Sequence, residues 1–156
     1  MIPPALQAQL ETAVGAAIGS FAPSSGGDIH RAALLSFADG RQFFLKYNTG
    51  PACAEMFRTE ALGLALLGAS GVIAVPKVKA HGQAGNHAFL LLEYITPGHR
   101  NRLFWQEFGA GLAALHGATS AQFGFAHDNF IGSLPQSNQR RDTWPEFYTE
   151  ARLLPQ

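Results

Sequence analysis

The sequence contains one cysteine, Cys53, and few charged residues, which make up 14% of the chain. A single cysteine excludes an internal disulfide framework and is typical of a reducing compartment. No window approaches the about 20 apolar residues that a membrane-spanning helix needs. The amino end, MIPPALQAQLETAVG, also lacks the basic segment and apolar stretch of a secretory signal peptide. These absences predict a cytoplasmic protein with no membrane partner.

A net charge is missing as well, because eleven basic residues balance eleven acidic ones. No overall field therefore favours nucleic acid as a partner. The six histidines are scattered, without acidic residues or cysteine at ligand spacing, so no metal site is predicted. What the chain does have is apolar residues, 47% of the total with twelve phenylalanines, which indicates a packed globular protein.

Hydrophobic periodicity and turn residues predict a mixed α+β fold. Helices are expected at residues 5–19, 53–68 and 104–117, with a further helix beginning near Trp144. Strands are expected at 29–37, 41–47 and 87–95, with a short strand interrupted by Pro76 before the last of these. Loops are expected at 20–28 and 118–143.

The stretch QFFLKYN, residues 42–48, contains a lysine in a run that otherwise reads as a buried strand. Alternation places Phe44 and Lys46 on the same face. One interpretation is that Lys46 extends from the end of an edge strand, with its stem on apolar surface and its amine in water. The other is that Lys46 meets a buried anionic partner.

Glu60 is the candidate partner, because it shares a predicted helix face with Met56, Leu64 and Leu67. A glutamate inside an apolar stripe is costly unless a cation meets it, which predicts an ion pair with Lys46. The alternative is that Glu60 lies at the margin of the stripe, half in water.

The stretch SSGGD, 24–28, stands directly before the predicted hairpin. Gly26 and Gly27 let the backbone approach a ligand closely, and successive N–H groups can bind phosphate oxygens. Taken alone, most such pairs are only turns.

The hairpin itself is predicted to turn at Asp39-Gly40. A two-residue turn there would put Ala33 across from Lys46, where a small side chain leaves room for a base or ribose.

The strand FLLLEYI ends at Glu93, Tyr94 and Ile95, before Pro97-Gly98. The C=O of Glu93 and the N–H of Ile95 could bond the edge of an adenine, as in a hinge between two lobes. The alternative is a core strand followed by a turn.

The predicted segments follow one another in a recognisable order. They are a loop, a strand, a strand with lysine, a helix with glutamate and a hinge strand. This order is the layout of a protein-kinase-like amino-terminal lobe.

The segment FGFAHDNFIGSLPQSN, 123–138, followed by TWPEFYTEARLLPQ, 143–156, resembles the signature of the fructosamine/ketosamine-3-kinase family, which is related to aminoglycoside and choline kinases. The earlier stretches GGDIHRA, DGRQFFLKYN, FRTEALGLALL, VPKVKAHG, LLLEYI and LAALHGATS agree, so the resemblance covers essentially the whole chain. Phe125 departs from it, since a tryptophan is expected there.

The resemblance implies a protein-kinase-like fold, with a five-stranded antiparallel small lobe and one helix at about 1–95. Residues 96–156 would then be the hinge exit and the first helices of a helical large lobe. The implied cofactors are ATP and Mg²⁺, and the implied substrate is a ketosamine (fructosamine, ribulosamine) on a glycated amine or protein, phosphorylated at the sugar 3-hydroxyl. The implied nucleotide-binding residues are Gly26, Gly27 and Asp28 in the phosphate loop, the pair Lys46 and Glu60, and Glu93, Tyr94 and Ile95 at the hinge.

The catalytic residues of such kinases are an aspartate, an asparagine five residues later and a further metal-binding aspartate. His127-Asp128 does not substitute, because Ser133 stands five residues after Asp128. The resemblance therefore implies that the catalytic aspartate lies beyond Gln156. Asp128 and Asn129 could line the sugar site or could brace their own loop, and both interpretations stay open.

Two alternatives to a ketosamine kinase remain at this stage. One is a non-catalytic, truncated module that binds nucleotide or a protein partner, with a homodimer as one form of it. The other is a small-molecule kinase with an aminoglycoside or choline as acceptor. The stripe of Trp105, Phe108, Leu112 and Leu115 is expected to be core and implies no cofactor.

Overall fold

The structure is a computed structural model that describes residues 1–24 and 29–155, in two compact units. The first unit is Met1–Arg100 and the second is Asn101–Gln156. No helix in the described ranges is both long and apolar enough to span a membrane.

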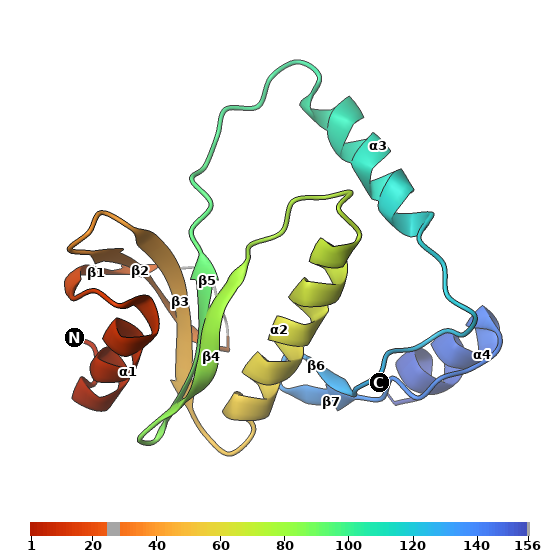
Figure 1. Cartoon of the computed structure of the whole chain (residues 1–156). Coiled ribbons are helices and arrows are strands. Elements are labelled where there is room, and N and C mark those ends of the chain that lie inside the picture. Colours follow the sequence, from red (N-terminus) through yellow and green to blue (C-terminus); the bar gives the residue numbers. More distant parts are fainter. Residues whose placement is uncertain (25–28, 156) are drawn as a thin grey trace. The chain divides into compact units, whose positions relative to one another are not determined.

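The first unit is built on a five-stranded antiparallel sheet with the strand order β1-β2-β3-β5-β4 (Figure 1). Its elements are α1 (Pro4–Val14), β1 (Ile18–Ser24), β2 (Arg31–Phe37), β3 (Gln42–Thr49), α2 (Cys53–Ala69), β4 (Val78–Ala84) and β5 (His87–Glu93). The predicted α+β class and the five-stranded antiparallel sheet are confirmed.

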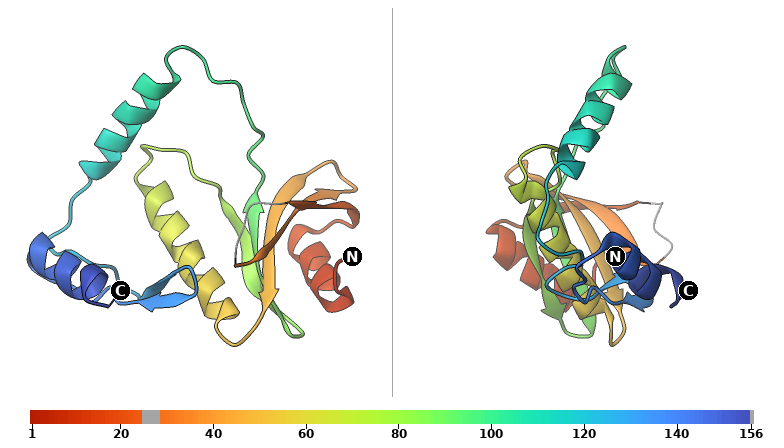
Figure 2. Two further views of the ribbon diagram at one scale, coloured as in Figure 1. Left: turned by 180° about the vertical axis from the view of Figure 1, so that it is seen from behind. Right: turned by 90° about the vertical axis from the view of Figure 1, so that its right-hand side faces the viewer.

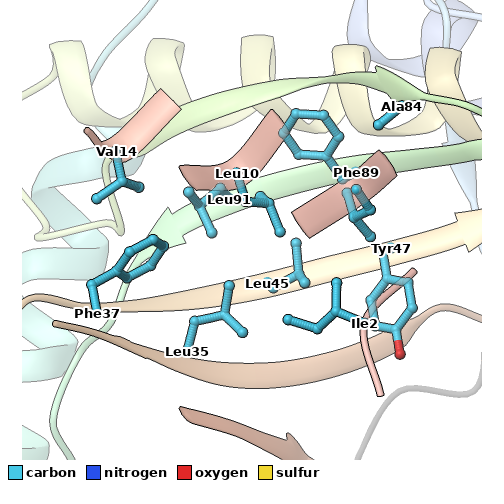
Figure 3. Close-up of a cluster of buried hydrophobic side chains, with 11 residues drawn as sticks. Ile2, Leu10, Val14, Leu35, Phe37, Leu45, Tyr47, Ala84, Phe89 and Leu91 are labelled. Atoms are coloured by element: carbon cyan, nitrogen blue, oxygen red, sulfur yellow. The ribbon is translucent and has the colours of Figure 1, made fainter. Parts of the chain in front are cut away.

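The two helices cover opposite faces of this sheet, α1 on one side and α2 on the other (Figures 1 and 2). On the α1 face, Leu10 and Val14 meet Leu45, Phe89 and Leu91 in a buried cluster (Figure 3). On the α2 face, the buried residues are Cys53, Phe57, Ala61, Ala88, Leu90 and Leu92. Alternating residues of β3 and β5 therefore supply two separate cores.

The first helix is shorter than the periodicity predicts, since α1 ends at Val14 and not near residue 19. Gly15 adopts the left-handed conformation at φ 78° and donates its N–H to the Glu11 carbonyl, which terminates the helix. The predicted loop 20–28 is likewise wrong over its first residues, because β1 occupies Ile18–Ser24 and forms an edge of the sheet.

The β2–β3 hairpin turns over three residues and not over two. The N–H of Phe37 donates to the carbonyl of Arg41 at 2.9 Å, and Gly40 sits at φ 86°. This is the geometry of a three-residue hairpin loop that ends in a left-handed glycine. The extra residue shifts the pairing by one position, so that Ala32 and not Ala33 lies across from Lys46.

The strand predicted at 87–95 is present as β5, between β3 and β4 and buried on both faces. The second predicted helix matches α2 closely.

The second unit contains α3 (Phe104–His116), a short hairpin of β6 (Asn129–Ile131) and β7 (Leu134–Gln136), α4 (Trp144–Tyr148) and a π-helical turn at Thr149–Leu153. The helix expected near Trp144 is confirmed, and Thr143 caps it by accepting from the Glu146 N–H. The prediction of a purely irregular stretch at 118–143 is wrong where β6 and β7 pair. None of the α3 residues is buried. Of the stripe expected to be core, Trp105, Phe108 and Leu112 are exposed and Leu115 is half-buried.

Two glycines with equally open surroundings provide a matched test of this backbone. A Cβ at Gly40 or at Gly63 would meet nothing within 4 Å, but only Gly40 has a positive φ. We expect Gly40→Ala to lower the free energy of unfolding by about 1–2 kcal/mol. We expect Gly63→Ala, inside α2, to raise it by up to about 1 kcal/mol. Urea unfolding measures both, and an equal effect of the two substitutions would contradict the turn described here.

Candidate functional site

An ion pair joins the middle strand of the sheet to α2. The Lys46 Nζ lies 2.8 Å from Glu60 Oε1 and 2.6 Å from Glu60 Oε2. The side chains are 26% and 33% exposed, respectively, so the pair is partly buried. Lys46 lies on β3, the central strand, which excludes the edge-strand interpretation. The predicted contact is present, and its role in binding a nucleotide stays a prediction.

The helix position of Glu60 differs in detail from the stripe that predicted it. The buried side of α2 runs through Cys53, Phe57 and Ala61, whereas Leu67 is exposed. Glu60 therefore lies at the margin of the buried side, one turn after Phe57. Both interpretations of its environment hold in part, because the carboxylate is at the margin and it also meets the cation.

Small and apolar residues flank the lysine on its own face of the sheet. Ala32 of β2 lies across from Lys46 on one side, and Leu90 of β5 on the other. Ala33, expected in the position of Ala32, is fully buried and pairs with Leu45. Ala32, one position before the expected Ala33, thus supplies the small side chain next to the Lys46 amine.

The predicted phosphate-loop residues Gly26, Gly27 and Asp28 lie outside the described residues. Their described flanks are nevertheless informative. Strands β1 and β2 pair as far as Ser24 and Ala32, and Ala32 in turn pairs with Lys46. The end of β1 and the start of β2 therefore lie beside the row that contains the lysine.

The predicted hinge follows directly on β5. Glu93 ends this strand, its N–H donates to the Lys77 carbonyl at 2.8 Å, and its carboxylate accepts from the Lys77 N–H at 3.2 Å. Tyr94 is half-buried, and Ile95 is 56% exposed. Glu93 lies three residues beyond Leu90, the partner of Lys46, which corresponds to roughly 10 Å along the strand.

A pocket of about 680 Å³ adjoins this hinge. It lies between the end of α2, the loop that follows and the start of β4. Its lining includes Leu64, Val75, Pro76, Lys77 and Glu93, and it does not include Lys46 or Glu60. The ion pair and not this pocket therefore defines the candidate site.

His30 is a residue near the ion pair that the sequence analysis did not select. Its ring packs on Phe57 with 4.5 Å between ring centroids. Burial lowers the pKa of His30, the charge of Lys46 lowers it further, and Glu60 opposes this shift. A signal was available in the alternation of IHRAALL, which puts His30 on the face of Ala32.

In the second unit, Asp128 binds its own loop. Its Oδ1 accepts from the Asn138 N–H at 2.8 Å, and Asn138 is 3% exposed. The Asn138 side chain donates to the His127 carbonyl at 3.0 Å and accepts from the guanidinium of Arg152. These contacts agree with the bracing interpretation of Asp128, and its role toward a sugar stays a prediction.

Asn129, the neighbouring candidate, begins the β6 strand. Its Oδ1 is buried and, among the side-chain atoms that the structure describes, finds no hydrogen-bond partner.

Comparisons with known proteins agree on one family. The family model described as fructosamine kinase matches residues 3–156. A probable ketoamine kinase of Synechocystis is 43% identical over 131 residues, which are 83% of this chain and 43% of that protein. The chloroplastic protein-ribulosamine 3-kinase of Arabidopsis thaliana is 41% identical over 120 residues, 74% of this chain and 36% of that protein.

Solved structures show the same relationship. A crystal structure described as a putative fructosamine-3-kinase from Haemophilus somnus matches with a TM-score of 0.84 and 27% identity, over 95% of this chain and 50% of that one. Another, from Thermobifida fusca, matches with a TM-score of 0.81 and 34% identity, over 96% and 51%. The chain thus spans less than half the length of those curated relatives and about half of these solved structures.

The partly buried ion pair makes a testable contribution to stability. We expect Lys46→Gln to lower the free energy of unfolding by about 1–2 kcal/mol, between the values for exposed and buried pairs. Arg58→Gln is the control, because Arg58 and Glu55 form a more exposed pair on the same helix, and we expect a change below about 0.5 kcal/mol. Chemical denaturation of the chain measures both, and equal losses would contradict a special environment for Lys46.

The bracing contact of Asp128 is testable at a single amide. Asp128→Ala removes the acceptor of the Asn138 N–H, and we expect the hydrogen exchange of that amide to accelerate about tenfold, the equivalent of one charge-assisted hydrogen bond. Asp128→Asn retains an Oδ1 acceptor and should leave the rate within about threefold of the original. Equal protection of the Asn138 amide in both variants would show that the contact does not brace the loop.

Proposed function

The chain belongs to the fructosamine kinase family, and we propose that its first unit is the nucleotide-binding lobe of an ATP- and Mg²⁺-dependent ketosamine kinase. The observation that carries this proposal is the ion pair between Lys46 of β3 and Glu60 of α2. In protein kinases the corresponding strand lysine binds nucleotide phosphates, and a helix glutamate orients it.

The chemistry of the amine supports this role. An ammonium group has three N–H donors and no acceptor. Two carboxylate oxygens of Glu60 lie within hydrogen-bond distance of the Lys46 Nζ. The third donor remains for a phosphate oxygen, and a phosphate group adds a charge-assisted hydrogen bond to a lysine that is already held in place.

The distance along the sheet also suits a nucleotide. With phosphates at Lys46, the base would lie toward Glu93, Tyr94 and Ile95, roughly 10 Å further along β5. The small side chain of Ala32 leaves space beside the lysine for the ribose. Within the described part of the chain no hydrogen bond engages the Ile95 N–H, so this donor can bond an adenine edge.

We assign the acceptor from the family. The reaction would transfer the γ-phosphate of ATP to the sugar 3-hydroxyl of a ketosamine on a glycated amine or protein, in the cytoplasm. The name of the Arabidopsis relative, a protein-ribulosamine 3-kinase, supports this acceptor class. An aminoglycoside or choline acceptor is the alternative, and a panel of the three acceptor types with a full-length relative would distinguish them.

The catalytic step itself would need groups that these residues do not supply. None of the four aspartates is followed by an asparagine five residues later. Among the described residues, no group of three or more His, Cys, Asp or Glu side chains could hold a metal ion. The role that we propose for the residues of this chain is therefore nucleotide binding.

Nucleotide binding can be measured directly by calorimetry with ATP·Mg²⁺ on the 156-residue chain. We expect Lys46→Ala to weaken binding about 10- to 100-fold, since a hydrogen bond to a charged group contributes about 1.5–3 kcal/mol. Lys79→Ala, which alters an exposed lysine of the edge strand β4, is the control and should bind like the unaltered chain.

Circular dichroism would confirm that each variant is folded. Unchanged affinity in folded Lys46→Ala would refute the phosphate role of this lysine. Absence of binding by the folded, unaltered chain would refute the proposal that the first unit binds nucleotide by itself.

A further inference from the structure

His30 connects three elements around the ion pair. Arg31 pairs with Tyr47, so the residue before it lies across from Asn48, on the face that also contains Lys46. The imidazole packs on Phe57 of α2 at 4.5 Å between ring centroids, with 46° between the planes. Phe57 is fully buried and precedes Glu60 by one helical turn. The imidazole therefore supports the part of α2 that carries the carboxylate.

The contacts of Asn48 determine which nitrogen of this imidazole carries the proton. The Oδ1 of Asn48 accepts from the Thr49 N–H at 2.9 Å, and its Nδ2 donates to the Ile29 carbonyl at 2.7 Å. The amide group that lies 3.5 Å from His30 Nδ1 is therefore the NH₂ group. An NH₂ group only donates, so this geometry favours an accepting Nδ1 and a proton on Nε2.

The surrounding charges favour the same neutral form. Among the residues that the structure describes, Lys46 of β3 and Glu60 of α2 are the charged groups that act on the imidazole. Burial and Lys46 lower the pKa of His30, and Glu60 opposes them with a weaker effect. A protonated imidazole would direct a second N–H at the NH₂ of Asn48. It would also repel the Lys46 amine and compete with it for Glu60.

We propose that neutral His30 is a positioning residue that holds α2 against the sheet and keeps the Lys46–Glu60 pair aligned for phosphate, and that protonation of His30 loosens this arrangement. The inference rests on the proposed nucleotide-binding function. The direction of this pH dependence follows from the linkage between proton binding and the aligned arrangement. Because the aligned state disfavours the extra proton, it is lost progressively as the pH falls below about 6.5, the ordinary pKa of histidine.

The first test compares the affinity for ATP·Mg²⁺ between pH 5.5 and 8 in the unaltered chain and in His30→Phe. The phenyl ring preserves the contact with Phe57 and removes the titrating group. Because the nucleotide also titrates in this range, the ratio of the two affinities at each pH is the quantity to follow. We expect a ratio near one at pH 8 and a loss of about threefold or more in the unaltered chain, relative to the variant, at pH 5.5.

Two further variants separate positioning from simple packing. His30→Ala removes the ring as well as the charge, and it should bind more weakly at every pH. His81→Phe, which alters an exposed histidine of β4, should retain the pH profile of the unaltered chain. A profile in His30→Phe that falls with acid as steeply as that of the unaltered chain would overturn the proposal.

The second test needs no nucleotide. In NMR spectra of the free chain, the His30 ring nitrogens should show the proton on Nε2 at neutral pH. The chemical shift of the Glu60 carboxyl carbon should change in a step as His30 titrates. This titration step should be absent in His30→Phe. A step that persists in the variant, or a proton on Nδ1, would refute the positioning role. If no variant binds ATP, the nucleotide-binding function fails, and the Glu60 step still decides whether His30 acts on the pair.

Discussion

The candidate site of the first unit depends on the partly buried ion pair between Lys46 of the sheet and Glu60 of α2. Removing a lysine from water is costly, and a central strand gives its side chain no free edge along which to reach solvent. Glu60 compensates for this cost from the margin of α2, with both carboxylate oxygens on the amine. Ala32 lies directly across from this lysine, and His30 packs on Phe57 one helical turn before the glutamate.

Much of this arrangement could be predicted from the sequence, because it depends on local periodicity. Alternation in QFFLKYN placed Phe44 and Lys46 on one face, and helical spacing brought Glu60 toward them. A glutamate on an apolar helix face requires a cation nearby, and Lys46 on the neighbouring strand is that cation. These are strong constraints, since moving either residue by one position would turn its side chain away.

The parts that were not predicted depend on backbone choices that the residue pattern does not encode. Asp39-Gly40 is compatible with a two-residue or a three-residue turn, and the choice moved the partner of Lys46 from Ala33 to Ala32. Gly15 ended α1 earlier than its apolar spacing suggested. His30 was passed over because its significance comes from Phe57 and Asn48, which are distant in sequence and close only after folding.

The strand order has a consequence for how the first unit is made during synthesis. The last strand of the first unit along the chain, β5, lies inside the sheet, between β3 and β4. It also completes both cores, since Leu91 meets α1 and Leu90 meets the α2 side. A chain growing from the ribosome therefore completes neither core until residue 91 has emerged. We expect apolar surface to stay exposed during that interval, which favours aggregation until the non-local pairing of β3 with β5 forms.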